Sequence, residues 1–185
     1  KRLIAVNGVN FTIPQGSVFG LIGSNGAGKT TTIRLMLGLH RPTAGSVTVF
    51  GKPMSVWAGK LRKRIGFLSQ TNNFPPDMTP IGYMDLIGKL FGIPNDERRA
   101  RLSALLHAVD LLPASSQKMA NLSTGMMTRV GIAASLINDP DLVLWDEPTI
   151  GLDPTGRKYT LDLARALRAE GKTILLSTHI LPDAD

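Results

Sequence analysis

The segment GSNGAGKT, residues 23–30, constrains the fold of this chain more than any other feature. It matches the pattern G-x-x-x-x-G-K-[ST], and it lies between the apolar run SVFGLI and the helix-like run TTTIRLMLGL. In this context the pattern predicts a phosphate-binding loop. Its glycines let successive backbone N–H groups point at phosphate oxygens, and the helix start adds a partial positive charge. A glycine-rich turn that contains a lysine by chance is the alternative.

The loop also predicts which side chains contact the nucleotide. Lys29 is expected to reach the β- and γ-phosphates, and the Thr30 hydroxyl is expected to ligate Mg²⁺. The residues expected to bind the nucleotide are Gly23, Ser24, Asn25, Gly26, Ala27, Gly28, Lys29, Thr30 and Thr31.

Strand-like and helix-like runs alternate along the chain, which is typical of an α/β fold with a mostly parallel sheet flanked by helices. A breaker-rich stretch, residues 72–80, precedes a helical region that runs from Pro80 to about Val109, with Asn95 or Asp96 as the cap of a second helix. The expected strands are residues 17–22, 46–50, 64–70, 141–145 and 173–178, and a further helix is expected over about 156–170.

This texture predicts two structural units. A phosphate-binding core is expected over residues 1–75 plus 138–185, where strands dominate. A helical subdomain of residues 76–137 is expected as an insertion into that core.

Polar side chains follow three of the expected strands. Asp146 and Glu147 follow LVLW, Gln70 ends another strand, and His179 follows LLST. Ligands of parallel sheets bind at the carboxyl ends of strands, so these side chains are expected near the phosphates. Asp146 is expected to hold Mg²⁺ directly or indirectly, and Glu147 to polarise the water that attacks the γ-phosphate. Each of them, taken singly, also fits an ordinary hydrogen-bonding residue in a loop.

Five elements in this order resemble the ATP-binding cassette (ABC) ATPase family, and the resemblance covers essentially the whole chain. GSNGAGKT is similar to Walker A, Gln70 to the Q-loop glutamine, LSTGM to the signature, LVLWDE to Walker B and STH to the H-switch. The resemblance implies a P-loop NTPase fold with ATP and Mg²⁺ as cofactors. It also implies that Lys29, Gln70, Glu147 and His179 are catalytic, and that Gln70 ligates the metal beside Thr30 and Asp146.

The signature lies far along the chain from the phosphate loop, and the resemblance accounts for this separation. In this family two cassettes pack head to tail, and the signature of one meets the γ-phosphate held by the other. Ser123 and the backbone of Gly125 are therefore expected to bind a partner's nucleotide, as is Asp153 of GLD, which is similar to the D-loop. A simple N-cap for a helix over residues 125–136 is an alternative, and one serine can serve both purposes.

The sequence departs from the family pattern at the signature and near the ends. Thr124 and Met126 replace the first glycine and the glutamine of the usual LSGGQ. A methionine at the second of these positions is similar to the drug, sodium and lipid exporter branch of the family. Thr124 costs backbone freedom if its position needs a positive φ. No aromatic residue precedes Phe11, which is expected in the core of a strand, so the usual adenine-stacking residue is missing. The chain is therefore expected to lack a first strand and C-terminal helices, with Ala5 or Val6 left on the adenine side and a lower nucleotide affinity.

Composition narrows the class of protein. The content of hydrophobic residues, 43%, and of charged residues, 19%, is typical of a soluble globular domain, and the absence of cysteine excludes disulfides and cysteine-ligated metal centres. No apolar run approaches the roughly 20 residues that cross a bilayer, and the N-terminus does not resemble a signal peptide.

The net charge is +7, with basic clusters at residues 60–64 and 97–101. These clusters fit solvated faces, an anionic membrane surface or nucleic acid; the few aromatic residues argue against stacking on single strands, and no nucleic-acid partner is expected.

Three functions of different classes fit these observations. The first is the ATP-hydrolysing subunit of a membrane exporter, paired with a second cassette (homo- or heterodimer) and a transmembrane permease subunit at the cytoplasmic face of the cell membrane. The second is a non-transport ABC ATPase of DNA repair or translation, but the stretch from Lys29 to Ser123 is too short for a long coiled coil. The third is an ATP-binding module without turnover, against which Glu147 and His179 argue. We expect the first.

Overall fold

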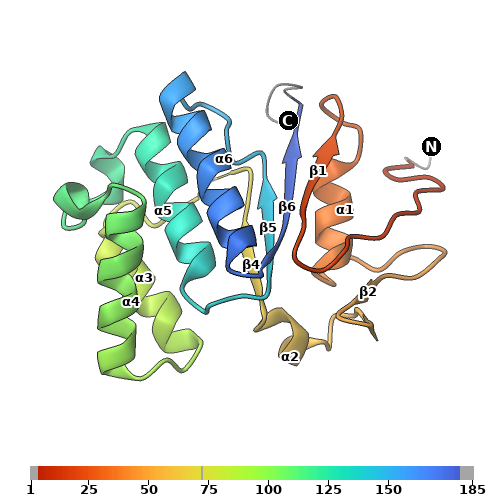
Figure 1. The fold of residues 1–185 in the computed structure, drawn as a ribbon, viewed down its shortest axis with the longest axis horizontal. Helices are drawn as coiled ribbons and strands as arrows, with labels where there is room; N and C mark the ends of the chain where they lie inside the picture. Colours follow the sequence, from red (N-terminus) through yellow and green to blue (C-terminus); the bar gives the residue numbers. More distant parts are fainter. Residues whose placement is uncertain (1–3, 72, 180–185) are drawn as a thin grey trace.

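Four parallel strands form the central sheet of the computed structural model, which describes residues 4–71 and 73–179 (Figure 1). The strands lie in the order β1-β6-β5-β4, and a two-stranded antiparallel hairpin lies beside this sheet. The strand bounds are β1 (Val18–Ile22), β2 (Thr48–Val49), β3 (Lys52–Pro53), β4 (Ile65–Leu68), β5 (Leu142–Asp146) and β6 (Thr173–Thr178). The predicted α/β fold with a mostly parallel sheet is confirmed.

Helices cover both faces of the sheet, as parallel connections require. They are α1 (Lys29–Met36), α2 (Gly59–Arg62), α3 (Pro80–Leu90), α4 (Asn95–Ala108), α5 (Thr124–Leu136) and α6 (Pro154–Ala169), with 3₁₀ turns η1 (Leu112–Ala114) and η2 (Met119–Asn121). Within the described residues, no helix has both the length and the apolar character needed to cross a membrane.

Side chains of the strands alternate between two hydrophobic cores, one on each face of the sheet. On β5, Leu142 and Leu144 belong to the core that contains Ile33 of α1. Val143 and Trp145 belong to the other core, which α5 and α6 cover. All five residues of β5 are buried, so its sequence is a nearly continuous apolar run rather than an alternation with polar residues.

The helices α3, α4 and α5 pack against one another on one side of the molecule, at the left of Figure 1. Met84, Leu106 and Ile132, one from each helix, are almost completely buried in a single cluster. That cluster continues through α5 to the sheet. The division into a core of residues 1–75 plus 138–185 and an inserted unit of residues 76–137 therefore stays a proposal.

The helix starts in this region differ in their capping. The Thr79 hydroxyl accepts a hydrogen bond from the Gly82 N–H, and Pro80 occupies the first turn of α3, as expected for an N-cap followed by proline. The predicted cap of α4 by Asn95 or Asp96 is wrong. Pro94 holds the N-cap position, so both residues lie inside the first turn, and the Asn95 amide oxygen instead accepts from the Arg98 guanidinium.

The backbones of β4 and α5 touch at Gly66. A Cβ atom at this position would lie 2.0 Å from the Ser135 carbonyl oxygen and 2.9 Å from Cγ of Pro140. Glycine is therefore the residue that allows this approach. The Asn138 amide strengthens the same junction, because its Nδ2 donates a 2.8 Å hydrogen bond to the Lys63 carbonyl.

Two strand predictions need correction. The strand predicted over residues 46–50 is shorter, because Phe50 and Gly51 both adopt a positive φ and form the two-residue turn between β2 and β3. Phe11 does not lie in a strand: among the described residues no strand precedes β1 for it to join. Its side chain is 39% exposed, and its ring stacks on Phe19 with a centroid distance of 5.4 Å.

The register of the sheet places the carboxyl ends of its strands at one edge, the upper edge in Figure 1. Ile22 of β1 pairs with Thr178 of β6, and Ser177 of β6 pairs with Asp146 of β5. The chain segments that follow these strands are therefore neighbours, as the sequence pattern predicted.

Candidate functional site

The phosphate loop has the backbone geometry of an anion-binding turn. Gly28 precedes α1 with φ 93° and no side-chain cap, so the first N–H groups of the helix are left for another acceptor. A Cβ atom at Gly28 would lie 2.4 Å from the Ala5 carbonyl oxygen, and Gly26 also has a positive φ of 82°. The two glycines are thus required by conformation, and by close contact in the case of Gly28.

Lys29 bends back over the loop that precedes it. Its Nζ donates hydrogen bonds to the carbonyl oxygens of Gly23 (2.7 Å) and Ser24 (3.2 Å), and the side chain is 8% exposed. The same Nζ lies 3.0 Å from Oε1 of Glu147, which is also buried. The lysine ammonium is therefore already placed at the loop where phosphates are expected.

Asp146 is held by two hydroxyl groups from neighbouring elements. Thr30 Oγ1 donates to Asp146 Oδ2 at 2.6 Å, and Ser177 Oγ donates to Oδ1 at 2.6 Å. The carboxylate is 1% exposed. These contacts fix the orientation of the aspartate beside the phosphate loop, which is where a metal carboxylate is expected.

Glu147 adopts a strained backbone with φ 56°, and contacts from three sides fix it. Its N–H donates to the carbonyl oxygen of Ser177 at 3.2 Å and to Ser177 Oγ at 2.9 Å. Its Oε1 pairs with Lys29, and its Oε2 lies 2.7 Å from Nδ1 of His179. Since a carboxylate is an acceptor, Nδ1 is the donor in this contact and Nε2 is left for another partner.

The sequence patterns did not predict a role for Ser177. It is completely buried, and it joins Asp146 and Glu147 through one hydroxyl group. The sequence does carry a signal for this role, because Ser177 places a hydroxyl inside the apolar run TILLST and a buried polar group needs a partner. The register of the sheet places Ser177 opposite Asp146.

Replacing Ser177 by alanine is expected to destabilise the protein by about 1–3 kcal/mol, because one oxygen of Asp146 and the N–H of Glu147 each lose a buried partner. Chemical denaturation measures the change. Ser103→Ala is the matched control: Ser103 is exposed on α4, and its replacement is expected to change stability by less than about 0.5 kcal/mol. Equal stability of the Ser177 variant and wild type would contradict the assignment.

A pocket of about 270 Å³ brings most of the predicted residues together. Gln70, two residues after β4, lines it together with Glu147 and the phosphate loop. Ile4 and Ala5 form another part of the pocket wall. Ala5, which is expected from the sequence on the adenine side, therefore lies next to the phosphate loop. The lining residues are Ile4, Ala5, Asn25, Gly26, Ala27, Gly28, Lys29, Thr30, Thr31, Gln70 and Glu147.

The signature residues lie outside this pocket. The Ser123 hydroxyl accepts from the Met126 N–H and caps α5, and Asp153 caps α6 by accepting from the Gly156 N–H. The two helix starts are neighbours, because a Cβ atom at Gly151 would lie 3.2 Å from Cγ2 of Thr124. Thr124 is not among the described non-glycine residues with a positive φ, so it fits the first turn of α5 without the predicted backbone cost.

A glycine-rich loop between β1 and α1, followed by strand-end carboxylates on a parallel sheet, defines the class of P-loop nucleotidases. Within that class, the chain belongs to the ABC transporter family and is an ATP-binding domain of it. The family described as "ABC transporter" matches residues 6–150.

The relatives support this assignment. The chain is 42% identical over 182 residues to the Nod factor export ATP-binding protein I of Cupriavidus pinatubonensis, covering 98% of this chain and 56% of that protein. It is 40% identical to the protein of the same name from Burkholderia lata, covering 98% of this chain and 60% of that protein. The chain thus spans less than two thirds of the length of these curated relatives.

Solved structures show the same fold. The ATP-binding cassette MJ0796, described as a dimer in a post-hydrolysis state bound to ADP and Pi, matches with a TM-score of 0.89 and 29% identity. The match covers 97% of this chain and 82% of that one. The ATP-binding subunit of an ABC transporter matches with a TM-score of 0.87 and 32% identity, covering 97% and 75% of the two chains.

Proposed function

We propose that the chain binds ATP with Mg²⁺ and hydrolyses it as the motor subunit of an exporter. The observation that carries this proposal is the convergence of the phosphate loop, Gln70 and Glu147 on one pocket, with Asp146 hydrogen-bonded to Thr30 beside them. The relatives named as export ATP-binding proteins support the direction of transport.

The donor set fits Mg²⁺. Thr30 Oγ1, the Asp146 carboxylate and the Gln70 amide supply oxygen ligands, which this hard cation prefers. Bound with the substrate, the ion would offset negative charge on the phosphates. Asp146 and Thr30 already touch, so the chain's own hydrogen bonds hold these two ligands in place.

The site residues divide the chemistry among them. The loop N–H groups and the Lys29 ammonium bind and orient the phosphates of ATP. Glu147 Oε1 now pairs with Lys29, so a phosphate that takes the lysine leaves this oxygen to accept the proton of the attacking water. His179 orients the other carboxylate oxygen through Nδ1, and its Nε2 can face the substrate.

A second cassette completes the site in this proposal. Ser123, Gly125 and Asp153 do not line the pocket of their own chain, yet their helix starts lie close together on the surface. A hydroxyl and free N–H groups at a helix start suit a phosphate brought by a partner. The dimer described for MJ0796 supports this arrangement.

A permease subunit is the proposed partner on the other side of Gln70. A groove of about 340 Å³ lies between β4, α3 and α5, and it is rich in aromatic side chains. Phe74 and Tyr83 meet edge to face there at 5.0 Å, and burial raises the pKa of Tyr83. An apolar groove of this size suits a short helix of a partner, and such a partner would place the chain at the cytoplasmic face of the cell membrane.

Mixing two inactive variants tests the head-to-tail site. Lys29→Ala removes the phosphate contact of one chain, and Ser123→Arg places a bulky cation at the signature. Each variant alone is expected to be inactive in ATP hydrolysis. In a mixed dimer one site combines an intact phosphate loop with an intact signature, so an equal mixture is expected to recover up to about a quarter of wild-type turnover by statistical pairing.

The controls separate the possible results. Each variant mixed with itself at the same total concentration must stay inactive. Both variants must be folded at the assay temperature, as measured by circular dichroism, so that recovered turnover reports pairing of two folded chains. A mixture that stays inactive, although cross-linking shows that the two variants form mixed dimers in the presence of ATP, would contradict a signature that acts on the partner's nucleotide.

A further inference from the structure

The basic cluster of residues 60–64 follows a tryptophan that the ATP site does not use. Trp57 is 91% exposed, and Val56 beside it is 54% exposed. Tryptophan is usually largely buried, because its side chain carries the largest apolar surface of any residue. An almost fully exposed indole therefore suggests that a membrane or a partner molecule covers this part of the surface. We call residues 55–64, which include α2, the Trp57 loop.

The Trp57 loop is held firmly. The Arg62 guanidinium donates to the carbonyl oxygens of Ser55 (3.0 Å), Val56 (2.7 Å) and Leu37 (3.5 Å). The loop also packs directly on the turn after α1, since a Cβ atom at Gly38 would lie 2.5 Å from the Ser55 carbonyl oxygen. These contacts fix the backbone before Trp57, so the indole is presented outward by a braced segment.

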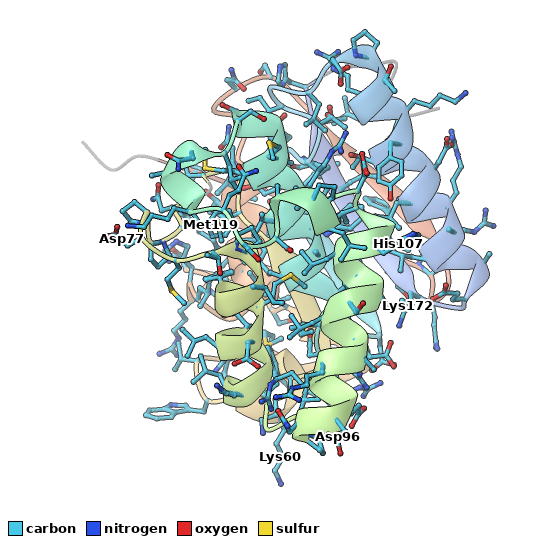
Figure 2. All side chains as sticks on the ribbon, turned by 90° about the vertical axis from the view of Figure 1, so that its left-hand side faces the viewer. Lys60, Asp77, Asp96, His107, Met119 and Lys172 are labelled. Atoms are coloured by element: carbon cyan, nitrogen blue, oxygen red, sulfur yellow. The ribbon has the colours of Figure 1, made fainter. Side chains whose placement is uncertain are left out.

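Two exposed lysines follow Trp57 closely in the sequence. Lys60 and Lys63 are exposed, lie three residues apart and so share a face of this short helical segment. In the part of the chain that the structure describes, neither lysine makes an ion pair, whereas Arg64 pairs with Asp141 at 2.6 Å. Figure 2 shows Lys60 extending away from the body of the molecule at its lower end.

Over the whole chain, positive charge also dominates the part of the sequence that contains the Trp57 loop. All 14 acidic residues lie at or after Asp77, whereas ten of the 21 basic residues precede it. No carboxylate from the first part of the chain can therefore neutralise the Trp57 loop. In Figure 1 this loop and α2 lie at the lower end of the sheet, whereas the phosphate loop lies at the upper end, where the strands end. The charge of the Trp57 loop is therefore not placed to bind the nucleotide.

We propose that the Trp57 loop contacts the headgroup layer of an anionic membrane. Indole rings favour the boundary between headgroups and acyl chains, and flanking lysines favour anionic lipids. Trp57 is 91% exposed and lines neither the nucleotide pocket nor the groove between β4, α3 and α5, so its indole projects from the surface. A projecting indole, with two lysines that make no ion pair among residues 4–71 and 73–179, fits the flat surface of a bilayer. This inference rests on the proposed function, which places the chain at a membrane.

Vesicle binding tests the proposal directly. The protein is sedimented with vesicles of phosphatidylcholine, with and without phosphatidylglycerol, and it is expected to bind only those that contain the anionic lipid. Binding should fall as salt is added, because salt screens the lysine charges. The emission of Trp57 should shift to the blue and be quenched by brominated acyl chains, whereas Trp145, which is completely buried, should report no change.

Two variants and a matched control localise the contact. Trp57→Ser should lose the fluorescence shift and weaken binding, and Lys60→Glu with Lys63→Glu should weaken binding by about tenfold or more. Lys158→Glu with Arg165→Glu makes the same change of net charge on α6, where both side chains are exposed, and should bind nearly as well as wild type.

Nucleotide binding by each variant is measured separately and should equal that of wild type. The proposal is overturned if the Trp57 and lysine variants bind vesicles as wild type does, if brominated lipids leave Trp57 unquenched, or if the chain binds DNA in preference to vesicles. Loss of ATP turnover with intact vesicle binding would instead count against the proposed function alone.

Discussion

Lys29→Ala is expected to abolish ATP turnover and to weaken nucleotide binding by about a hundredfold or more. The variant removes the ammonium that the phosphate loop places for the β- and γ-phosphates, and a charged donor of this kind contributes strongly to a site sheltered from water. It also leaves the buried Oε1 of Glu147 without its lysine partner, so the nucleotide-free protein should lose about 1–3 kcal/mol of stability. Fluorescent-nucleotide titration, phosphate release and chemical denaturation measure the three effects.

Lys29→Arg is the matched control for this variant. Arginine keeps the charge and can still pair with Glu147, so stability should stay near that of wild type. Its planar guanidinium does not fit the two carbonyl oxygens that Lys29 contacts, so turnover should still be lost. Unchanged ATPase activity in the alanine variant would contradict the assignment of the phosphate loop.

Glu147→Gln is expected to keep ATP binding and to reduce hydrolysis by about 10²–10⁴-fold, because the amide fills the same space but cannot accept the proton of the attacking water. ATP should then hold two chains together without being consumed. Light scattering with and without Mg-ATP is expected to show a nucleotide-dependent shift from monomer to dimer.

The result for the Glu147 variant distinguishes three hypotheses about how the chain uses ATP. A dimer that forms only with ATP supports a signature that works in trans despite Thr124. A monomer that still binds ATP would favour a binding module that does not close. Turnover at the wild-type rate would place the general base on another residue. The double variant Lys29→Ala, Glu147→Gln serves as the control and should stay monomeric.

The sequence predicted the class of the fold and most of the pocket. A phosphate loop must follow a strand and precede a helix, and parallel strands bring their carboxyl ends to one edge, so Gln70 and Glu147 could be placed near Lys29. The patterns were also sufficient for the cap of α5 by Ser123, because a serine before a helical run is a local signal.

Contacts that depend on three-dimensional register could not be predicted. The pairing of Lys29 with Glu147 and the bridging role of Ser177 depend on where β1, β5 and β6 align, which no local pattern encodes. Phe11 was misplaced because alternation near it is typical of a strand, whereas a strand forms only beside a partner. Asn95 was misplaced by one position because proline can occupy the N-cap itself.

The contact at Gly66 has a mechanical consequence. Between most helices and sheets a layer of side chains can deform and absorb a small displacement. At Gly66 that layer is absent, because the strand faces the carbonyl oxygen of Ser135 directly. We therefore expect a displacement of β4 to move α5 with it, and Ser123 caps the other end of this helix. A partner that pushes on the groove beside β4 would then act on the signature through the thirteen residues of α5.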